Sequence, residues 1–430
     1  MNRVVIIGLD GVPYGLLRDF ADKGIMPKTK EIIEKGAFSK MASSIPEISS
    51  VAWSSIITGK NPAEHGIFGF TDFPENTYRL SFPNFSQLKT ETFWEKDSNN
   101  RHIIVNVPST YPARELNGIL ISGFVALDLE RAVYPDAMVA HLEDMDYRVD
   151  VDSAKAHKSL ELFLKDLNMT NEARINAYRH LWEEEWNTFM FVFTGSDRLM
   201  HFLWDAYEDE NHEFHHDFVN YFKRVDMIIG EIASKMKKDD NLIMLSDHGF
   251  ERLENDVYVN RILREKGFLN LMEQEKISFS SIDHGTKAFA LDPARIYINL
   301  EGKYPRGSVP ASQKENVIKE LEEVFNNFEI EGRKVIQRVY RKEEVYKGSY
   351  VDRAPDLVLI GDKGFNLKAA INAERVYSKG IFTGKHTQDD AFLLVDKQRK
   401  AGVIPENVNV SDVVSVIEKL KEEVNERQVA

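Results

Sequence analysis

The 430-residue sequence contains no cysteine. This absence excludes disulfide-stabilised scaffolds, catalytic thiolates and zinc sites with cysteine ligands. The sequence is also short of positive charge, with 55 lysine and arginine residues against 69 aspartate and glutamate residues and a net charge of −14. The excess of acid argues against a nucleic-acid partner and against binding to an anionic membrane, because either needs a concentrated basic face.

Long apolar runs are missing as well. No window reaches the roughly 18 apolar residues of a membrane-spanning helix. The opening stretch MNRVVIIGLDG is too short for a signal peptide and has no small-residue cleavage site. We therefore expect a cytoplasmic protein with no membrane partner. A hydrophobic content of 43% allows a large core, and the length suits one large domain with an insertion, or two domains.

Three apolar segments share one pattern, because each ends in an aspartate: Val4 to Asp10, Thr188 to Asp197, and Asn241 to Asp247. Continuous apolar runs of this kind are typical of strands buried on both faces. Helical patterns lie between them, which predicts an α/β fold with a doubly wound, mostly parallel sheet. Ligands bind such sheets at the carboxyl ends of the strands, so we expect the three aspartates to share that edge. Aspartate also caps turns and helices, and this remains the alternative interpretation.

Histidines accompany these acids. His248 follows Asp247 directly, and His201 lies four residues after Asp197, one turn along the same face of a helix. His386 stands in the polar segment GKHTQDD, and by itself it would be an ordinary loop residue. Oxygen and imidazole ligands together suit Zn²⁺, Mn²⁺ or Fe²⁺, and six of them suffice for two divalent ions with open positions. The six candidate ligands are Asp10, Asp197, His201, Asp247, His248 and His386.

A candidate nucleophile lies in SSIPEISSVAWSSIITG, which predicts a helix closed by Gly59. Ser49 or Ser50 would lie at or near its N-cap, where serine is favoured for structural reasons alone. A helix N-terminus also binds phosphate, and a hydroxyl bound there to a metal ion is able to attack phosphorus. The residues alone leave both interpretations open.

Six segments, in order from Val4 to Val395, resemble the alkaline phosphatase superfamily. They come closest to its type I phosphodiesterase/nucleotide pyrophosphatase family, and VAWSS is most similar to uncharacterised prokaryotic members. The segments are GLDG, MPKTKEIIEKGA, the serine segment ending in TGKNPAEHGIFGF, DRLMHFLWD, SDHGF and GKHTQDD. The resemblance implies an alkaline phosphatase-like fold and a metal-dependent hydrolase of small phosphate esters.

The resemblance also implies a role for each residue. One ion, usually zinc in the family, would be held by Asp10, Asp247 and His248 and would bind the nucleophile Ser49, ten residues before Gly59. The nearby Ser50 is the second choice for the nucleophile, or its backbone N–H binds a phosphate oxygen. The second ion would be held by Asp197, His201 and His386.

Two features depart from related enzymes. Nucleotide pyrophosphatases usually have asparagine three residues after the nucleophile, where this chain has Ala52; the departure concerns that activity and not the metal chemistry. The serines also lack the Cys/Ser-x-Pro-x-Arg context of sulfatases.

The expected activity is hydrolysis of phosphodiester or pyrophosphate bonds in a nucleotide-like substrate through a phosphoserine intermediate. The alternatives are a phosphomonoesterase or phosphotransferase of the same superfamily, and a binding protein that has lost catalysis. The sequence leaves open the physiological substrate, the native metal and the oligomeric state.

We expect residues 1–250 and 385–430 to form the catalytic core and residues 251–384 to form an inserted α/β cap, which carries none of the proposed ligands. Within it, His284 and Lys287 either approach the substrate or belong to an ordinary polar loop. A further cluster, interpreted as an adventitious metal site or as a solvated helix face or lid, comprises His212, His215 and His216.

Overall fold

The computed structural model describes residues 3–396 and 402–422. The chain divides into two compact units: a core unit of Met1–Lys60, Asn84–Phe250 and Phe382–Ala430, and a second unit of Asn61–Pro83 and Glu251–Ile381. This division differs from the expected one at residues 61–83, which were expected in the core, and at residues 382–384, which were expected in the insertion. Residues 61–83 pack within the second unit, where the Tyr350 N–H donates to the Ala63 carbonyl at 2.8 Å. The role of the second unit as a cap remains a prediction.

An eight-stranded sheet forms the centre of the core unit, in the order β2-β18-β7-β1-β6-β3-β4-β5. The five strands β7-β1-β6-β3-β4 are parallel, whereas β18 runs antiparallel to both β7 and β2, and β5 runs antiparallel to β4. The predicted doubly wound, mostly parallel sheet is confirmed. The strands are β1 Val4–Leu9, β2 Ala37–Met41, β3 His102–Val107, β4 Gly118–Ser122, β5 Val133–Tyr134, β6 Thr188–Phe193, β7 Asn241–Leu245 and β18 Ala391–Val395.

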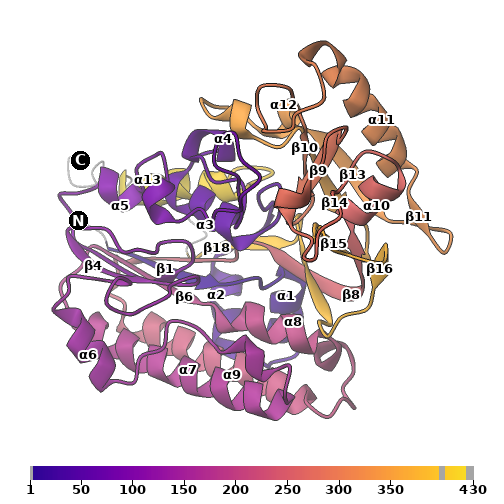
Figure 1. Ribbon diagram of the computed structural model, residues 1–430. Coiled ribbons are helices and arrows are strands. Elements are labelled where there is room, and N and C mark those ends of the chain that lie inside the picture. Colours follow the sequence, from indigo (N-terminus) through magenta and orange to yellow (C-terminus); the bar gives the residue numbers. More distant parts are fainter. Residues whose placement is uncertain (1–2, 397–401, 423–430) are drawn as a thin grey trace. The chain divides into compact units, whose positions relative to one another are not determined.

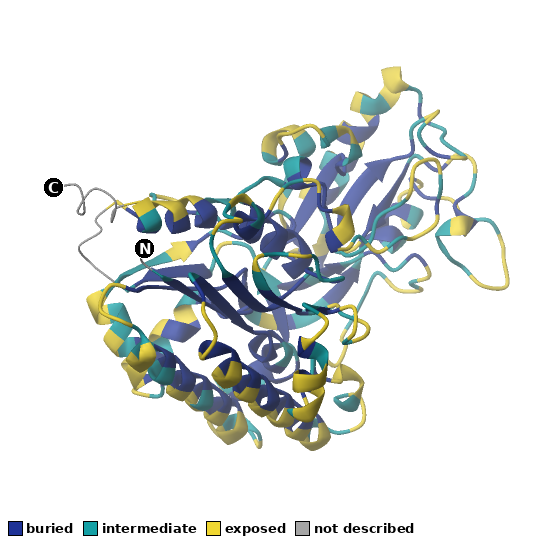
Figure 2. Ribbon diagram, turned by 90° about the vertical axis from the view of Figure 1, so that its left-hand side faces the viewer, coloured by how far each residue is buried: buried dark blue, intermediate teal, exposed yellow. Residues whose placement is uncertain are grey.

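Helices cover both faces of this sheet. Figure 1 shows α7 and α9 below it, and α3 and α13 above it. The long helices α7 and α9 have apolar inner faces and exposed outer faces, α3 is buried along its whole length, and the strands at the centre of the sheet, β1, β3, β6 and β7, are buried throughout (Figure 2). None of the helices in the described ranges has the length and apolar character needed to span a bilayer. The helices are α1 Tyr14–Asp22, α2 Pro27–Lys35, α3 Ser49–Thr58, α5 Phe93–Lys96, α6 Met138–Asp144, α7 Leu160–Trp182, α8 Gly195–Glu208, α9 His215–Lys235 and α13 Val413–Glu422.

The strand register brings three strand ends level. Residue Leu9 of β1 lies opposite Phe193 of β6, and Gly8 lies opposite Leu245 of β7. Gly8 also allows α3 to approach the sheet, because a Cβ atom at this position would lie 2.7 Å from the buried ring of Trp53. The helix that begins at Ser49 is thereby seated directly on the central strand.

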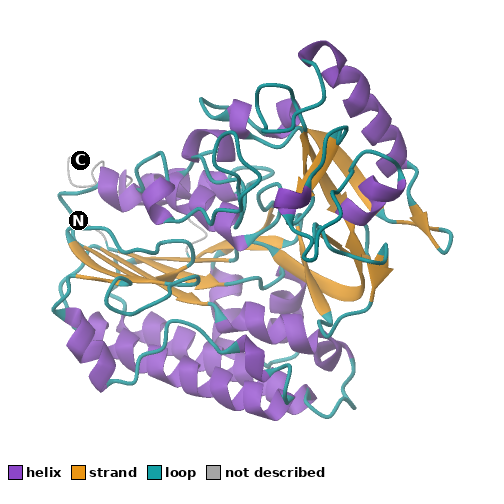
Figure 3. Ribbon diagram, in the orientation of Figure 1, coloured by secondary structure: helices purple, strands orange, loops and turns teal. Residues whose placement is uncertain are grey.

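The second unit has its own sheets and its own apolar core (Figure 3). One sheet is antiparallel in the order β13-β14-β10-β9, and another contains β15-β8-β16. Its main elements are α4 Pro62–His65, β8 Gly249–Tyr258, α10 Val259–Glu265, β9 Ala288–Leu291, β10 Arg295–Ile298, α11 Lys314–Asn326, β13 Ile336–Arg341, α12 Lys342–Val345, β14 Leu357–Gly361, β15 Gly364–Lys368 and β16 Tyr377–Ser378.

The buried carboxylate of Asp226 joins helices α2 and α9 of the core unit. Asp226 of α9 accepts hydrogen bonds from the N–H groups of Lys28 and Thr29 at 3.0 and 2.7 Å, and from the Thr29 hydroxyl at 2.7 Å. It therefore caps α2, whose own N-cap residue Met26 supplies no side-chain hydrogen bond. We expect Asp226→Ala to lower the free energy of unfolding by about 1–3 kcal/mol, because three donors lose their acceptor.

Chemical denaturation followed by circular dichroism measures this loss. Asp239→Ala is the control, since Asp239 is exposed just beyond α9. An Asp226→Ala protein as stable as the control would contradict the capping role.

Candidate metal-binding and catalytic site

The three predicted carboxylates lie together at the carboxyl edge of the parallel strands. Asp10 directly follows β1, and Asp247 lies two residues beyond the end of β7. Asp197 was expected at the end of a strand, and this was wrong. Strand β6 ends at Phe193, and Asp197 lies in the first turn of α8. The chain turns into this helix immediately after the strand, so the side chain still reaches the sheet edge.

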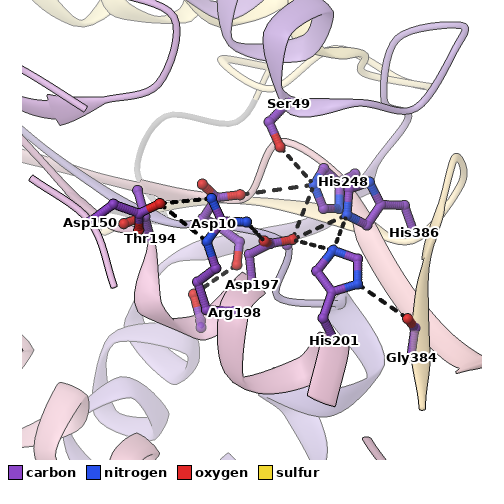
Figure 4. A network of polar contacts seen from close by, with 12 residues as sticks. Asp10, Ser49, Asp150, Thr194, Asp197, Arg198, His201, His248, Gly384 and His386 are labelled. Carbon is purple, nitrogen blue, oxygen red and sulfur yellow. Dashed lines mark hydrogen bonds and ion pairs between the residues drawn. The ribbon is translucent and has the colours of Figure 1, made fainter. Parts of the chain in front are cut away.

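Three imidazoles converge on Asp197 (Figure 4). His386, on β17 Gly384–Thr387, places its Nε2 atom 3.1 Å from Asp197 Oδ1 and 3.0 Å from His201 Nε2. The Nε2 atom of His248 lies 3.9 Å from the same oxygen. His386 therefore lies on a strand and not in the loop expected from the sequence, and together with the helical spacing of Asp197 and His201 this brings the predicted residues to one point.

The other ring nitrogen of each histidine faces a backbone carbonyl. The Nδ1 atoms of His201, His386 and His248 lie 3.2, 3.0 and 3.1 Å from the carbonyl oxygens of Gly384, Glu47 and Gly249. Donation from Nδ1–H fixes the tautomer and leaves a lone pair on each Nε2. Two such lone pairs 3.0 Å apart repel each other unless a proton or a metal ion lies between them. Burial lowers the pKa of His386, but its hydrogen bond with Asp197 and the charge of that carboxylate act against burial, and the net effect raises that pKa. The arrangement fits a metal ion.

The two remaining carboxylates support the same conclusion. Asp10 and Asp247 are 3% and 0% exposed, so their charges are removed from water. Asp247 Oδ1 accepts the N–H of Gly11 at 3.0 Å, but Asp247 Oδ2 and Asp10 Oδ1 are buried without a hydrogen-bond partner. A buried carboxylate oxygen without a donor is costly, and a bound cation removes that cost.

Two groups of potential ligands have their donor atoms within 4.8 Å of one another: Asp197 with His201 and His386, and Asp10 with Asp197 and His248. The first is the set that the resemblance implied. The second contains Asp197 in place of Asp247, although Asp247 Oδ2 lies 3.4 Å from His248 Nε2. Nitrogen and oxygen donors of this kind suit zinc, manganese or iron.

The protonation of these groups follows from burial and mutual charge. Burial raises the pKa of Asp10 well above its usual range, and the charges of Asp247 and Asp197 raise it further. Burial also acts on Asp197, but His201 and His386 hold the pKa of Asp197 below its usual range. Burial lowers the pKa of His201 to about 3, which keeps its Nε2 available as a metal ligand.

Ser49 and Ser50 begin α3, whose N-cap position is occupied by Ile48 without a side-chain hydrogen bond. Neither serine is therefore the N-cap, because Ile48 is the last residue with extended backbone. Ser49 Oγ lies 3.3 Å from His248 Nε2 (Figure 4), whereas Ser50 Oγ is buried without a partner. Ala52, also buried, offers no polar atom.

Two charged residues missed by the sequence analysis lie beside the ligands. Arg198 donates to Asp197 Oδ2 at 3.3 Å and to Asp150 Oδ2 at 2.8 Å. The arginine directly follows a proposed ligand in SDRLMH, which is a signal that could have been used. Asp150 has no such signal.

The other candidate residues lie elsewhere. His212 Nε2 is 3.7 Å from Asp205, and His215 Nδ1 is 2.7 Å from the Ala206 carbonyl. Within the described residues, neither these two histidines nor His216 belongs to a three-ligand group. In the second unit His284 is exposed, and Lys287 lies 3.3 Å from Glu320.

Comparison with known proteins identifies the family and the fold of the chain. The family model for type I phosphodiesterase/nucleotide pyrophosphatase matches residues 4–389. Comparison with curated protein sequences finds no match. Among solved structures, phosphonoacetate hydrolase from Sinorhizobium meliloti is 16% identical, with a TM-score of 0.66, and the match covers 97% of this chain and 96% of that one. Murine ectonucleotide pyrophosphatase/phosphodiesterase 5 is 14% identical, with a TM-score of 0.55 and coverage of 98% and 95%. At these identities the similarity establishes the fold.

The ligand geometry predicts that divalent ions stabilise the folded protein. Adding Zn²⁺ or Mn²⁺ to chelator-treated protein is expected to raise the melting temperature, by the equivalent of about 2.7 kcal/mol at 100 times the dissociation constant. His386→Ala should remove most of this increase, because it takes a ligand from the Asp197 group. Differential scanning calorimetry measures both effects, and His212→Ala is the control that should respond like the natural protein. An equal increase in His386→Ala would show that the ions bind elsewhere.

Proposed function

Because the chain belongs to the type I phosphodiesterase/nucleotide pyrophosphatase family, and is thus a metal-dependent hydrolase of the alkaline phosphatase superfamily, we propose the following activity. With two divalent ions bound, it cleaves phosphodiester or pyrophosphate bonds of a nucleotide-like substrate. The reaction passes through a phosphoester of Ser49.

The main support for this proposal is the position of the Ser49 hydroxyl. Ser49 Oγ lies 3.3 Å from His248 Nε2, and His248 lies within 4 Å of the carboxylates of Asp10 and Asp247. A nucleophile, imidazole nitrogens and buried carboxylate oxygens therefore meet at one edge of the sheet. This combination supports a hydrolytic site more than a closed structural metal site, which would have no hydroxyl beside it.

The candidate ligands fit divalent ions, and such ions would lower the pKa of a coordinated hydroxyl and neutralise phosphate oxygens. The six residues that would hold them are Asp10, Asp197, His201, Asp247, His248 and His386.

The first residues of α3 supply the remaining parts of the site. The backbone N–H groups of Ser49 and Ser50 lie in the first turn, where no carbonyl of the same helix accepts them, so they are suited to bind a phosphate oxygen. Ser49 Oγ attacks phosphorus, the bond from phosphorus to the leaving oxygen breaks, and a serine phosphoester forms. Water then attacks the same phosphorus and releases Ser49.

Substitution of the two serines tests the nucleophile. We expect Ser49→Ala to lower kcat by about 10³-fold or more, because no other hydroxyl replaces the attacking atom. Ser50→Ala is the matched control and should retain the serine phosphoester. Tandem mass spectrometry of acid-quenched reactions should locate on Ser49 the group left by the substrate, which for a diester is a phosphoryl group that still carries one ester substituent. Activity that survives in Ser49→Ala but is lost in Ser50→Ala would move the nucleophile to Ser50.

The substrate class is tested with the metal-loaded protein. Bis(p-nitrophenyl) phosphate is expected to be hydrolysed with a higher kcat/KM than p-nitrophenyl phosphate, because the proposed substrate is a diester. A preference for the monoester would favour a phosphomonoesterase. Phosphonoacetate belongs in the same assay, since a protein of similar fold hydrolyses it. Turnover of phosphonoacetate alone would overturn the phosphodiesterase assignment.

A further inference from the structure

The two carboxylate oxygens of Asp197 have different partners, Arg198 on one side and the imidazoles on the other. Its guanidinium donates to Asp197 Oδ2 at 3.3 Å. The other oxygen, Oδ1, faces the imidazoles, with His386 Nε2 at 3.1 Å and His201 Nε2 at 3.4 Å. Because Arg198 holds Oδ2, the carboxylate presents only Oδ1 to the three imidazoles (Figure 4).

The guanidinium is itself held in place by Asp150 and Phe124. Asp150 Oδ2 accepts from Arg198 Nη2 at 2.8 Å and from Nε at 3.3 Å. The guanidinium carbon of Arg198 lies 4.1 Å from the centre of the Phe124 ring. Contacts on its edge and on its face leave the group little freedom to turn away from Asp197.

A second buried arginine anchors the segment that carries Asp150. Arg174 of α7 is 2% exposed, and it donates to the carbonyl of Arg148 at 3.1 Å and to that of Val149. It also donates to the hydroxyl of Thr194 at 2.5 Å, and Thr194 directly precedes α8. Arg174 therefore ties the segment bearing Asp150 to the start of the helix that bears Asp197.

The charges of this network have opposite effects on a metal ligand. A guanidinium beside Asp197 orients the carboxylate, but its positive charge opposes a cation bound to the same carboxylate. Asp150 lies on the other side of the guanidinium and offsets part of that charge, while its Oδ1 atom lies 3.8 Å from the guanidinium of Arg174. Arg198 can thus hold Asp197 in position without greatly weakening it as a ligand.

We propose that Arg198 and Asp150 form a charge-compensated pair that positions Asp197 and sets the affinity of the ion held by Asp197, His201 and His386. The inference rests on the proposed function, since it assumes an ion at that group. Arg198 and Asp150 are positioning residues, because their contacts are with the ligand and with each other.

The test is a calorimetric titration of Zn²⁺ into chelator-stripped, full-length protein. Asp150→Asn is expected to weaken the binding of one ion about 10- to 100-fold, which is the usual effect of replacing a residue that helps to orient a metal ligand. The matched control is Glu231→Gln, which removes the carboxylate partner of Arg179 in a surface pair with a 2.7 Å contact. It should bind Zn²⁺ like the natural protein.

The double variant Asp150→Asn/Arg198→Gln separates charge compensation from a purely structural role. It should bind the weakened ion several-fold more tightly than Asp150→Asn alone, because the uncompensated guanidinium is gone. If the pair were only structural, the double variant would bind as weakly as Asp150→Asn or more weakly, and that result would overturn the proposal.

Two further outcomes are decisive. Unchanged Zn²⁺ binding in Asp150→Asn would overturn this inference alone, whereas absence of Zn²⁺ binding in the natural protein would overturn the proposed function as well. Circular dichroism and melting temperature establish that each variant folds. If Asp150→Asn does not fold, Arg198→Lys takes its place, since lysine keeps the charge but loses the planar fork. Arg198→Lys should weaken the same ion, and unchanged binding would overturn the proposal.

Discussion

The parallel register of β1 with β6 and β7 is the constraint on which the site depends. Leu9 lies opposite Phe193 and Gly8 opposite Leu245, so the three strands end at nearly the same level. The residues that follow each strand are therefore delivered to one edge. A shift of one residue in either pairing would displace an acidic side chain by about 3.3 Å, which exceeds the tolerance of metal coordination.

The same sheet also seats the candidate nucleophile. Gly8 lies on β1, two residues before Asp10, and the absence of a side chain there lets Trp53 of α3 pack against the strand. The first turn of α3 is then held near the strand ends, where Ser49 lies beside His248. Close packing of one helix on one strand thus links the hydrophobic core to the geometry of the site.

Much of this arrangement could be predicted from the sequence, because strand patterns and ligand types are local properties. The apolar runs before Asp10 and Asp247 predicted the strands, and the four-residue spacing predicted that His201 would face Asp197. Pairing of distant segments is not local, and no sequence pattern indicates the contact between Arg198 and Asp150, which lie 48 residues apart. The assignment of residues 61–83 to the second unit depends on long-range packing in the same way.

Charge explains why these long-range contacts matter at the site. Three carboxylates lie in a region from which water is excluded, and burial favours the neutral form of His201. Such a cluster is unfavourable unless cations balance it. Arg198 supplies one positive charge, but Asp150 accepts two hydrogen bonds from the same guanidinium and offsets part of that charge. The negative charge that faces the imidazoles therefore remains for ions and for the substrate that they bind, which is the electrostatic requirement of a phosphate-ester hydrolase.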